Sequence, residues 1–323
     1  MNFPVSQQPI MRSNRNLHAL IAAATLLMPA AGALAQAQPA QNEYTPKVGQ
    51  SGKDVIWVPT PQRLVDKMLD MAKVAPGDFV IDLGSGDGVL VIASAKRGAR
   101  AIGIELNPEL IELSKRNADK AGLADKTSFT QGDLFDHDFS QATVITMYLL
   151  PDLNLKLRPK ILALKPGTRI VSNSWHMGDW QADDTASIVS FKSYIAPFLN
   201  EIKSFVPAWL IENMKDYCNL QCVAYLWIVP AKVAGTWRLP HGELALRQRY
   251  QMVEGTLNTD GRMAAISGGR LRGDRLSFTA GGAEYSGRVT GGRIEGSVKS
   301  GGSTVAWSAT LRADNPVSSA KSP

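Results

Sequence analysis

Apolar and polar positions alternate in blocks along residues 54–180, and these blocks predict strands and helices in turn. Residues 79–81 and 144–147 are largely apolar, which is typical of central parallel strands that are covered on both faces. Runs at 101–104 and 169–172 predict two further strands. The intervening residues 89–96, together with the 151–164 segment, have the pattern of helices. This order predicts an α/β fold built on an open, mainly parallel sheet.

From Gly235 onward the pattern changes to short alternating runs separated by Gly-Gly, Asp-Gly and Gly-Asp pairs. The alternation has the two-residue period of strands, and the glycine pairs mark tight turns. We expect an antiparallel meander of about eight short strands, arranged as a small lipocalin-like barrel or an open sandwich. A barrel-like, all-β accessory domain is therefore predicted at residues 231–313. It follows an α/β domain at 53–230 and precedes a tail at 314–323.

Residues 191–217 fit neither pattern. They are rich in aromatic and aliphatic side chains and are interrupted by Pro197 and Pro207. A lid over the substrate, a membrane-surface helix or a partner-docking element would each fit this composition.

The N-terminus has the parts of an export signal. Arg12 and Arg15 are the positive start, residues 17–31 are mostly apolar, and Ala33-Leu34-Ala35 or Ala35-Gln36-Ala37 offers a cleavage site. We expect a signal peptide at 1–37, a flexible linker at 38–52, and a periplasmic or envelope-associated protein without a transmembrane segment after cleavage. The alternatives are a chain anchored by its uncleaved leader, and a cytoplasmic protein.

Charge and cysteine content add two open questions. The net charge is +6, and residues 231–313 hold two lysines and ten arginines against six acids. This basic excess predicts either an anionic partner surface or an ordinary solvated β surface. Cys218 and Cys222 are the only cysteines. They could form a disulfide in an exported protein, or be two small, partly buried side chains.

The segment Asp82-Leu83-Gly84-Ser85-Gly86-Asp87-Gly88 joins a predicted strand to a predicted helix, as ligand-binding loops do. Glycine lets the backbone turn sharply and lets a ligand approach where a Cβ would clash. Dinucleotide-binding loops read G-x-G-x-x-G, whereas here the glycines alternate and an acid precedes them. A pyrophosphate does not need that carboxylate, but the cationic methionine end of S-adenosylmethionine favours it. The loop therefore predicts a ligand site, and its acid fits S-adenosylmethionine better than a dinucleotide.

Two more acids follow strands of the same predicted sheet. Glu105 ends the 101–104 run, where a carboxylate can accept both ribose hydroxyls of a nucleotide. Asn107 and Pro108 then predict the start of a helix. Asp133 would accept a hydrogen bond from the adenine amino group. Since the carboxyl ends of parallel strands meet at one edge, these acids and the glycine loop should converge on one crevice.

With these motifs the sequence resembles the class I S-adenosylmethionine-dependent methyltransferases, through DLGSGDG, GIELNP and QGDL. It is most similar to the protein-lysine methyltransferases related to the ATP-synthase c-subunit lysine methyltransferase, also through Val58-Pro59-Thr60-Pro61. The resemblance implies a Rossmann-like seven-stranded methyltransferase core and S-adenosyl-L-methionine as cofactor. The expected cofactor-binding residues are Thr60, Asp82, Gly84, Ser85, Gly86, Gly88, Glu105, Leu106, Asn107, Asp133 and Leu134.

The acceptor side has fewer motifs. After the predicted fourth strand, Tyr148-Leu149-Leu150-Pro151 lacks the Asn/Asp-Pro-Pro-aromatic motif of adenine-N6 and glutamine methyltransferases. It also lacks the cysteine nucleophile of a cytosine-C5 mechanism. Tyr148 is a candidate to line a slot for an aliphatic amine, or to pack under the next helix. His176 is a candidate base for a lysine ammonium, or an ordinary loop residue. Trp175 and Trp180 are candidate walls around a cation, or core residues.

The leading hypothesis is an exported methyltransferase that acts on protein lysine by in-line displacement, with no metal implied. A small molecule or a lipid headgroup is the alternative acceptor. A hypothesis from another class is a non-catalytic envelope protein that binds a ligand on a methyltransferase fold.

Overall fold

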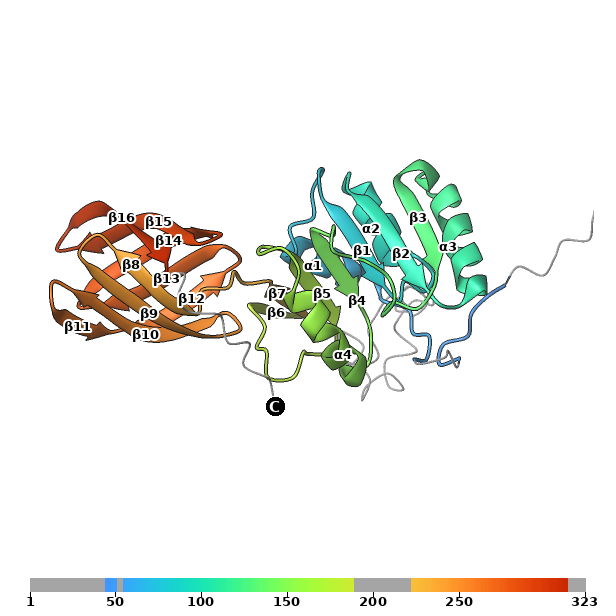
Figure 1. Ribbon diagram of the computed structural model, residues 1–323. Helices are drawn as coiled ribbons and strands as arrows, with labels where there is room; N and C mark the ends of the chain where they lie inside the picture. The colour runs from blue at the N-terminus through green and yellow to red at the C-terminus, as the bar shows by residue number, and fades with distance from the viewer. Residues whose placement is uncertain (1–43, 51–54, 189–221, 313–323) are drawn as a thin grey trace, which may run out of the picture. The chain divides into compact units, whose positions relative to one another are not determined.

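The computed structural model describes residues 44–50, 55–188 and 222–312 (Figure 1). One sheet has seven strands in the order β3-β2-β1-β4-β5-β7-β6. They are β1 (Phe79–Leu83), β2 (Arg100–Glu105), β3 (Thr127–Gln131), β4 (Val144–Met147), β5 (Arg169–Asn173), β6 (Asp184–Ser187) and β7 (Val223–Ile228). Neighbours from β3 to β5 are parallel, β7 is antiparallel to β5, and β6 is antiparallel to β7. The predicted Rossmann-like core is confirmed.

Helices cover both faces of this sheet. They are α1 (Gln62–Met71), α2 (Val89–Lys96), α3 (Pro108–Lys120) and α4 (Pro151–Leu162). Val80 and Val144 belong to a buried cluster with α1 and α2, whereas their chain neighbours Ile81 and Ile145 belong to a second cluster with α4. Successive strand residues point to opposite faces, so two-sided covering explains why these strands are apolar throughout.

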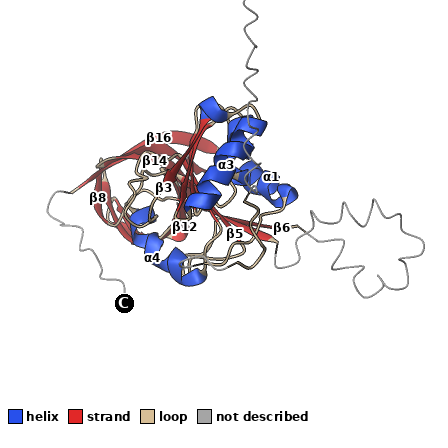
Figure 2. Cartoon of the chain, turned by 90° about the vertical axis from the view of Figure 1, so that its right-hand side faces the viewer, coloured by secondary structure: helices blue, strands red, loops and turns tan. Residues whose placement is uncertain are grey.

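The C-terminal strands close into a barrel. They are β8 (Gly235–Leu239), β9 (Gly242–Arg249), β10 (Met252–Thr259), β11 (Arg262–Ala265), β12 (Ser267–Arg272), β13 (Arg275–Ala280), β14 (Ala283–Thr290), β15 (Arg293–Ser300) and β16 (Ser303–Leu311). Every pairing among them is antiparallel, and β9 pairs with β10, which closes the ring. Because β11 and β12 both pair with the same edge of β10, the barrel has eight positions. The barrel alternative is confirmed, and the open sandwich is excluded. Among the described residues, those from Val223 on contain strands and no helix (Figure 2).

The barrel has its own apolar core and a partly neutralised outer surface. Trp237, Leu244, Leu271 and Ile294 are fully buried within one apolar cluster. Five of its ten arginines form ion pairs with acids, namely Arg249, Arg270, Arg288, Arg293 and Arg312. Part of the basic excess is therefore balanced within the chain.

Both sheets belong to one compact unit, Tyr44–Pro323. Residues 44–50, expected within a flexible linker, are tied to the core. Gly49 N donates to Trp57 O at 2.9 Å and Trp57 N donates to Gln50 O at 3.0 Å.

Cys222, next to β7, is disulfide-bonded, as the first alternative for the cysteines expected. Cys218, the predicted signal peptide 1–37, most of the 38–52 linker, the 191–217 segment and the 314–323 tail lie outside the described residues. No helix in the described ranges has the length and apolar character needed to cross a membrane.

Candidate active site

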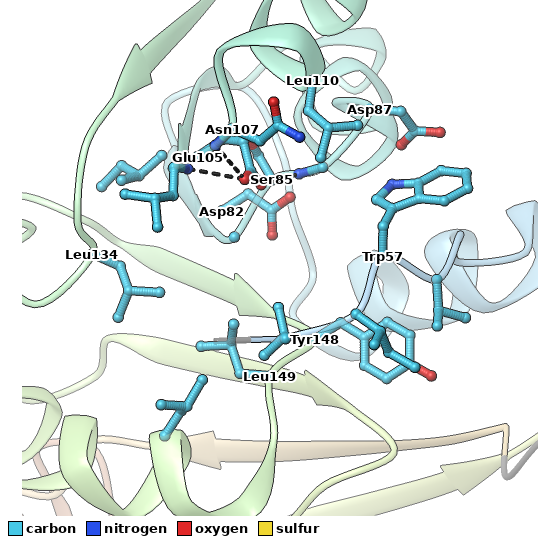
Figure 3. A pocket seen from close by; sticks show the side chains of 18 of the residues that line it. Trp57, Asp82, Ser85, Asp87, Glu105, Asn107, Leu110, Leu134, Tyr148 and Leu149 are labelled. Atoms are coloured by element: carbon cyan, nitrogen blue, oxygen red, sulfur yellow. Dashed lines mark hydrogen bonds between the residues drawn. The ribbon is translucent and has the colours of Figure 1, made fainter. Parts of the chain in front are cut away.

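A cavity of about 450 Å³ lies at the carboxyl ends of the parallel strands. Its lining comes from the loops after β1, β2, β3, β4 and β5, together with residues 55–60 before α1. Ligands of open α/β sheets bind at this edge. In Figure 3, Glu105 and Asn107 lie on one side of the cavity, Tyr148 and Leu149 lie across from them, and Trp57 lies at one end.

The glycine loop after β1 is fixed by backbone contacts. Gly84 N and Ser85 N both donate to Ile104 O, at 2.9 and 3.0 Å. Gly86 has a φ of 54°, and a Cβ there would lie 3.1 Å from Trp57 Nε1. Glycine is favoured at this position because a side chain would strain the backbone and would press against the indole of Trp57.

Glu105 organises the loop that faces it. Its Oε2 accepts a hydrogen bond from Gly86 N at 2.9 Å, and its Oε1 accepts from Leu106 N and Asn107 N at 2.9 and 3.0 Å. Asn107 in turn caps α3 by accepting from Glu109 N at 2.8 Å, so the predicted helix start is confirmed. A carboxylate has about four lone-pair sites, which leaves Glu105 capacity for a ligand hydroxyl.

The electrostatics of the cavity favour a cation. Asp82 is buried, and this burial raises the pKa of its carboxyl to about 7 although Thr146 Oγ1 donates to it at 2.6 Å. The charges of Glu105 and Asp87 raise the pKa of Asp82 further. Burial also raises the pKa of Asp87. A cation bound near these acids would stabilise their ionised forms.

The structure brings ten of the eleven predicted cofactor residues together. Thr60, Asp82, Gly84, Ser85, Gly86, Glu105, Leu106, Asn107, Asp133 and Leu134 all line the cavity. Gly88 does not line it. It precedes α2 with a φ of 81°, and a Cβ there would meet Phe129 and Ser114 at about 3 Å, so its role is structural.

Of the two catalytic candidates, one lines the cavity and the other does not. Tyr148 lines the cavity. His176 does not, and its Nδ1 accepts a hydrogen bond from Gly178 N at 3.0 Å. The Nδ1 atom of His176 is therefore engaged by the backbone of its own loop. Trp175 lines the cavity, whereas Trp180 is fully buried in the core.

The remaining lining residues were not among the predicted ones. They are mostly apolar and include Gln50, Val55, Ile56, Trp57, Phe135, Leu149, Leu150 and Leu153. Trp57 follows no strand, so the rule that ligand residues follow strands could not find it. The only signal for this segment was the resemblance around Val58-Pro59-Thr60-Pro61.

These features fit S-adenosylmethionine. Ser85 lines the cavity, but its Oγ is buried against Gly103 of β2 and has no hydrogen-bond partner among the described residues. Three acids suit a ligand with a sulfonium and an ammonium, and the apolar lining suits a purine. No group of three metal-ligating side chains occurs in the part of the chain that the structure describes.

Comparisons with known proteins agree with the geometry. The ANTKMT methyltransferase domain family matches residues 82–184. A protein-lysine N-methyltransferase of Saccharolobus islandicus is 41% identical over 42% of this chain and 85% of its own length. The ATP-synthase c-subunit lysine N-methyltransferase of Mus musculus is 34% identical over 40% of this chain, which spans about half (52%) of that relative.

Among solved structures, an RNA methyltransferase from Salinibacter ruber in complex with S-adenosyl-L-homocysteine is 39% identical. The alignment covers 55% of this chain and 96% of that chain, with a TM-score of 0.44. The identity to the Saccharolobus islandicus enzyme over most of its length is what shows the family. The chain belongs to the S-adenosylmethionine-dependent methyltransferases, in the family that includes these protein-lysine N-methyltransferases.

Proposed function

We propose that the protein methylates lysine side chains of a protein acceptor. The observation that carries this proposal is the composition of the cavity, whose lining combines acidic residues with the aromatic side chains of Trp57, Tyr148 and Trp175. Aromatic faces attract ammonium groups, and the apolar Leu149 and Leu150 suit the aliphatic stem of a lysine. The relative at 41% identity is named as a protein-lysine N-methyltransferase, which supports the same acceptor.

Within this proposal the acids have separate roles. Glu105 would accept a hydrogen bond from a ribose hydroxyl, Asp133 would accept one from the adenine amino group, and Asp82 would lie near the cationic methionine end. S-adenosylmethionine supplies an electrophilic methyl group, whose bond to sulfur breaks as its bond to the lysine nitrogen forms. The chain contributes alignment of the two partners and exclusion of water rather than acid–base chemistry. The lysine must lose its proton first, and we assign no such role to His176.

Radiolabel transfer tests the proposal. Purified protein is incubated with S-adenosylmethionine carrying a tritiated methyl group and with an extract from cells that lack the gene. We expect label in protein, on lysine side chains as mapped by mass spectrometry, and much less label with the Glu105→Ala variant at the same cofactor concentration. Label in small molecules or lipids would establish the alternative acceptor class. Binding of S-adenosylhomocysteine without any transfer would support the non-catalytic alternative instead.

We also propose that the protein is exported, on the basis of Arg12, Arg15 and Ala33-Leu34-Ala35. N-terminal sequencing of protein from fractionated cells should find a mature chain that begins at Gln36 or Gln38, outside the cytoplasmic membrane. A native cytoplasmic species that still carries Arg12 would contradict export.

A further inference from the structure

We propose that the C-terminal barrel positions the acceptor side of the active site, by holding the loop after β5 through Asp179. In this proposal, which rests on the proposed function for its acceptor, Arg249 and Tyr250 are positioning residues for methyl transfer. They act through Asp179 on Trp175, which lines the cavity.

The loop after β5 leaves the sheet in a conformation that needs support. Ser174 has a φ of 63°, which is unfavourable for a residue with a Cβ. Asn154 of α4 is fully buried and donates from Nδ2 to Trp175 O at 3.2 Å and to His176 O at 3.4 Å. Arg158 of α4 donates to Met177 O at 3.0 Å. These bonds from α4 hold the backbone of the loop at residues 175–177.

The barrel contacts the end of the same loop, at Asp179. Asp179, four positions after Trp175, accepts from Arg249 Nη2 and from Tyr250 Oη, both at 2.9 Å. The same carboxylate accepts from Arg158 Nη1 at 2.5 Å. These bonds, that from Arg249 foremost, hold the pKa of Asp179 well below its usual range. One carboxylate thus joins α4, the loop and the barrel.

Further barrel residues contact the chain directly after Asp179. The buried ring of Trp180 stacks on Tyr250, with centroids 5.8 Å apart and planes inclined by 18°. Gln251 Nε2 donates to Gln181 O at 2.7 Å. Further along, Arg270 of the barrel pairs at 2.7 Å with Asp183, whose side chain is fully buried. The barrel is therefore attached along the whole segment 179–183, at the end of the loop that carries Trp175.

We expect the Asp179 contacts to affect the position of Trp175 more than the stability of the chain. Asp179 is half exposed, and exposed ion pairs contribute little to stability. Displacing a group that orients a reactant by about 1 Å can nevertheless cost about a hundredfold in rate. Loss of the Asp179 contacts should therefore alter Trp175 and acceptor binding, with the cofactor site unchanged.

The test uses the full-length chain labelled with 5-fluorotryptophan. The single variants are Tyr250→Phe, Arg249→Gln and Arg249→Lys, and the double variant combines Tyr250→Phe with Arg249→Gln. Tyr250→Phe removes the hydroxyl but keeps the ring stacked on Trp180. Arg293→Gln and Tyr285→Phe are matched controls, because Arg293 forms an exposed pair within the barrel and Tyr285 is half-buried there. The fluorine resonance of Trp175 is assigned by its loss in Trp175→Phe.

We expect the Trp175 resonance to shift or broaden in the double variant, to recover partly in Arg249→Lys, and to stay unchanged in both controls. Affinity for S-adenosylhomocysteine should change less than twofold. In the tritium assay, the extract concentration that gives half-maximal transfer should rise about fivefold or more, with a smaller change in the maximal rate.

An unchanged Trp175 resonance in the folded double variant would overturn the proposal, whether or not transfer is observed. A double variant that loses S-adenosylhomocysteine binding would also overturn it, because the contacts would then support the whole fold. If no transfer occurs with the wild-type chain, the proposed function fails, while the resonance still decides the role of the barrel.

Discussion

Glu105 combines two tasks in one carboxylate, since it holds Gly86 N and, in the proposed function, the cofactor ribose. Glu105→Ala should leave a folded chain whose affinity for S-adenosylhomocysteine is about a hundredfold lower, or roughly 2–3 kcal/mol for lost charge-assisted bonds. Isothermal titration calorimetry measures this. Glu109→Ala, an exposed acid on α3, is the control. Unchanged affinity in folded Glu105→Ala would remove Glu105 from the site.

Asp82 should make stability and cofactor binding respond to pH in opposite directions. Burial raises the pKa of its carboxyl in the folded chain to about 7 from the ordinary 3.8. Between these values the native chain keeps a proton that the unfolded chain has released. The contribution of Asp82 to the free energy of unfolding is therefore present at low pH and is lost as pH rises through about 7. A cationic cofactor favours the carboxylate, so its affinity should rise over the same interval.

The Asp82→Asn variant isolates these effects. Thermal unfolding without cofactor and calorimetric titration with S-adenosylmethionine are compared at about pH 5.5 and about pH 8.5, either side of the shifted pKa. We expect the wild type to lose stability relative to Asp82→Asn at the higher pH, and to gain more affinity for S-adenosylmethionine than the variant does. The same pH response in both proteins would show that Asp82 is not the titrating group.

At the scale of elements, the junction before α2 depends on a glycine. Gly88 has a φ of 81°, and an added Cβ would lie 2.9 Å from Phe129. Gly122, after α3, has a φ of 67° and no atom within 4 Å of an added Cβ. Gly122→Ala should cost about 1–2 kcal/mol of unfolding free energy from the backbone alone. Gly88→Ala should cost about 1–3 kcal/mol more through overpacking. Urea denaturation measures both, and equal losses would exclude the clash with Phe129.

The sequence predicted helices and strands best where packing requires apolar residues at regular positions. The strand at Val144–Met147 and the helix at Val89–Lys96 have their predicted bounds. The helix predicted over 151–164 ends at Leu162. The edge strand β6 was missed because Asp184–Ser187 is polar and mostly exposed. Its place in the sheet depends on backbone hydrogen bonds to β7, and such bonds require no apolar side chains in the sequence of β6.

For the whole molecule, we predict that the α/β domain can fold without the barrel, although both belong to one compact unit. The clusters of the α/β sheet and that of the barrel are distinct. A chain truncated near Val233 should therefore stay soluble and bind S-adenosylhomocysteine. Its melting temperature should fall by about 2–8 °C, the shift expected for about 1 kcal/mol, because Trp180 loses Tyr250 and Asp179 loses Arg249. Differential scanning calorimetry and titration test this. Precipitation or loss of binding in every such truncation would contradict the boundary.

The sequence alone determined the chemistry of the cofactor side. Glycines and acids that directly follow strands must meet at one sheet edge, so Gly84, Glu105 and Asp133 could be placed together without coordinates. The acceptor side depended on tertiary structure. Trp57 reaches Gly86 from a segment before α1, and Tyr250 reaches Asp179 across 71 residues. Such contacts have no local period or spacing, because they depend on how separate elements pack and on which hydrogen-bond partner each side chain meets there.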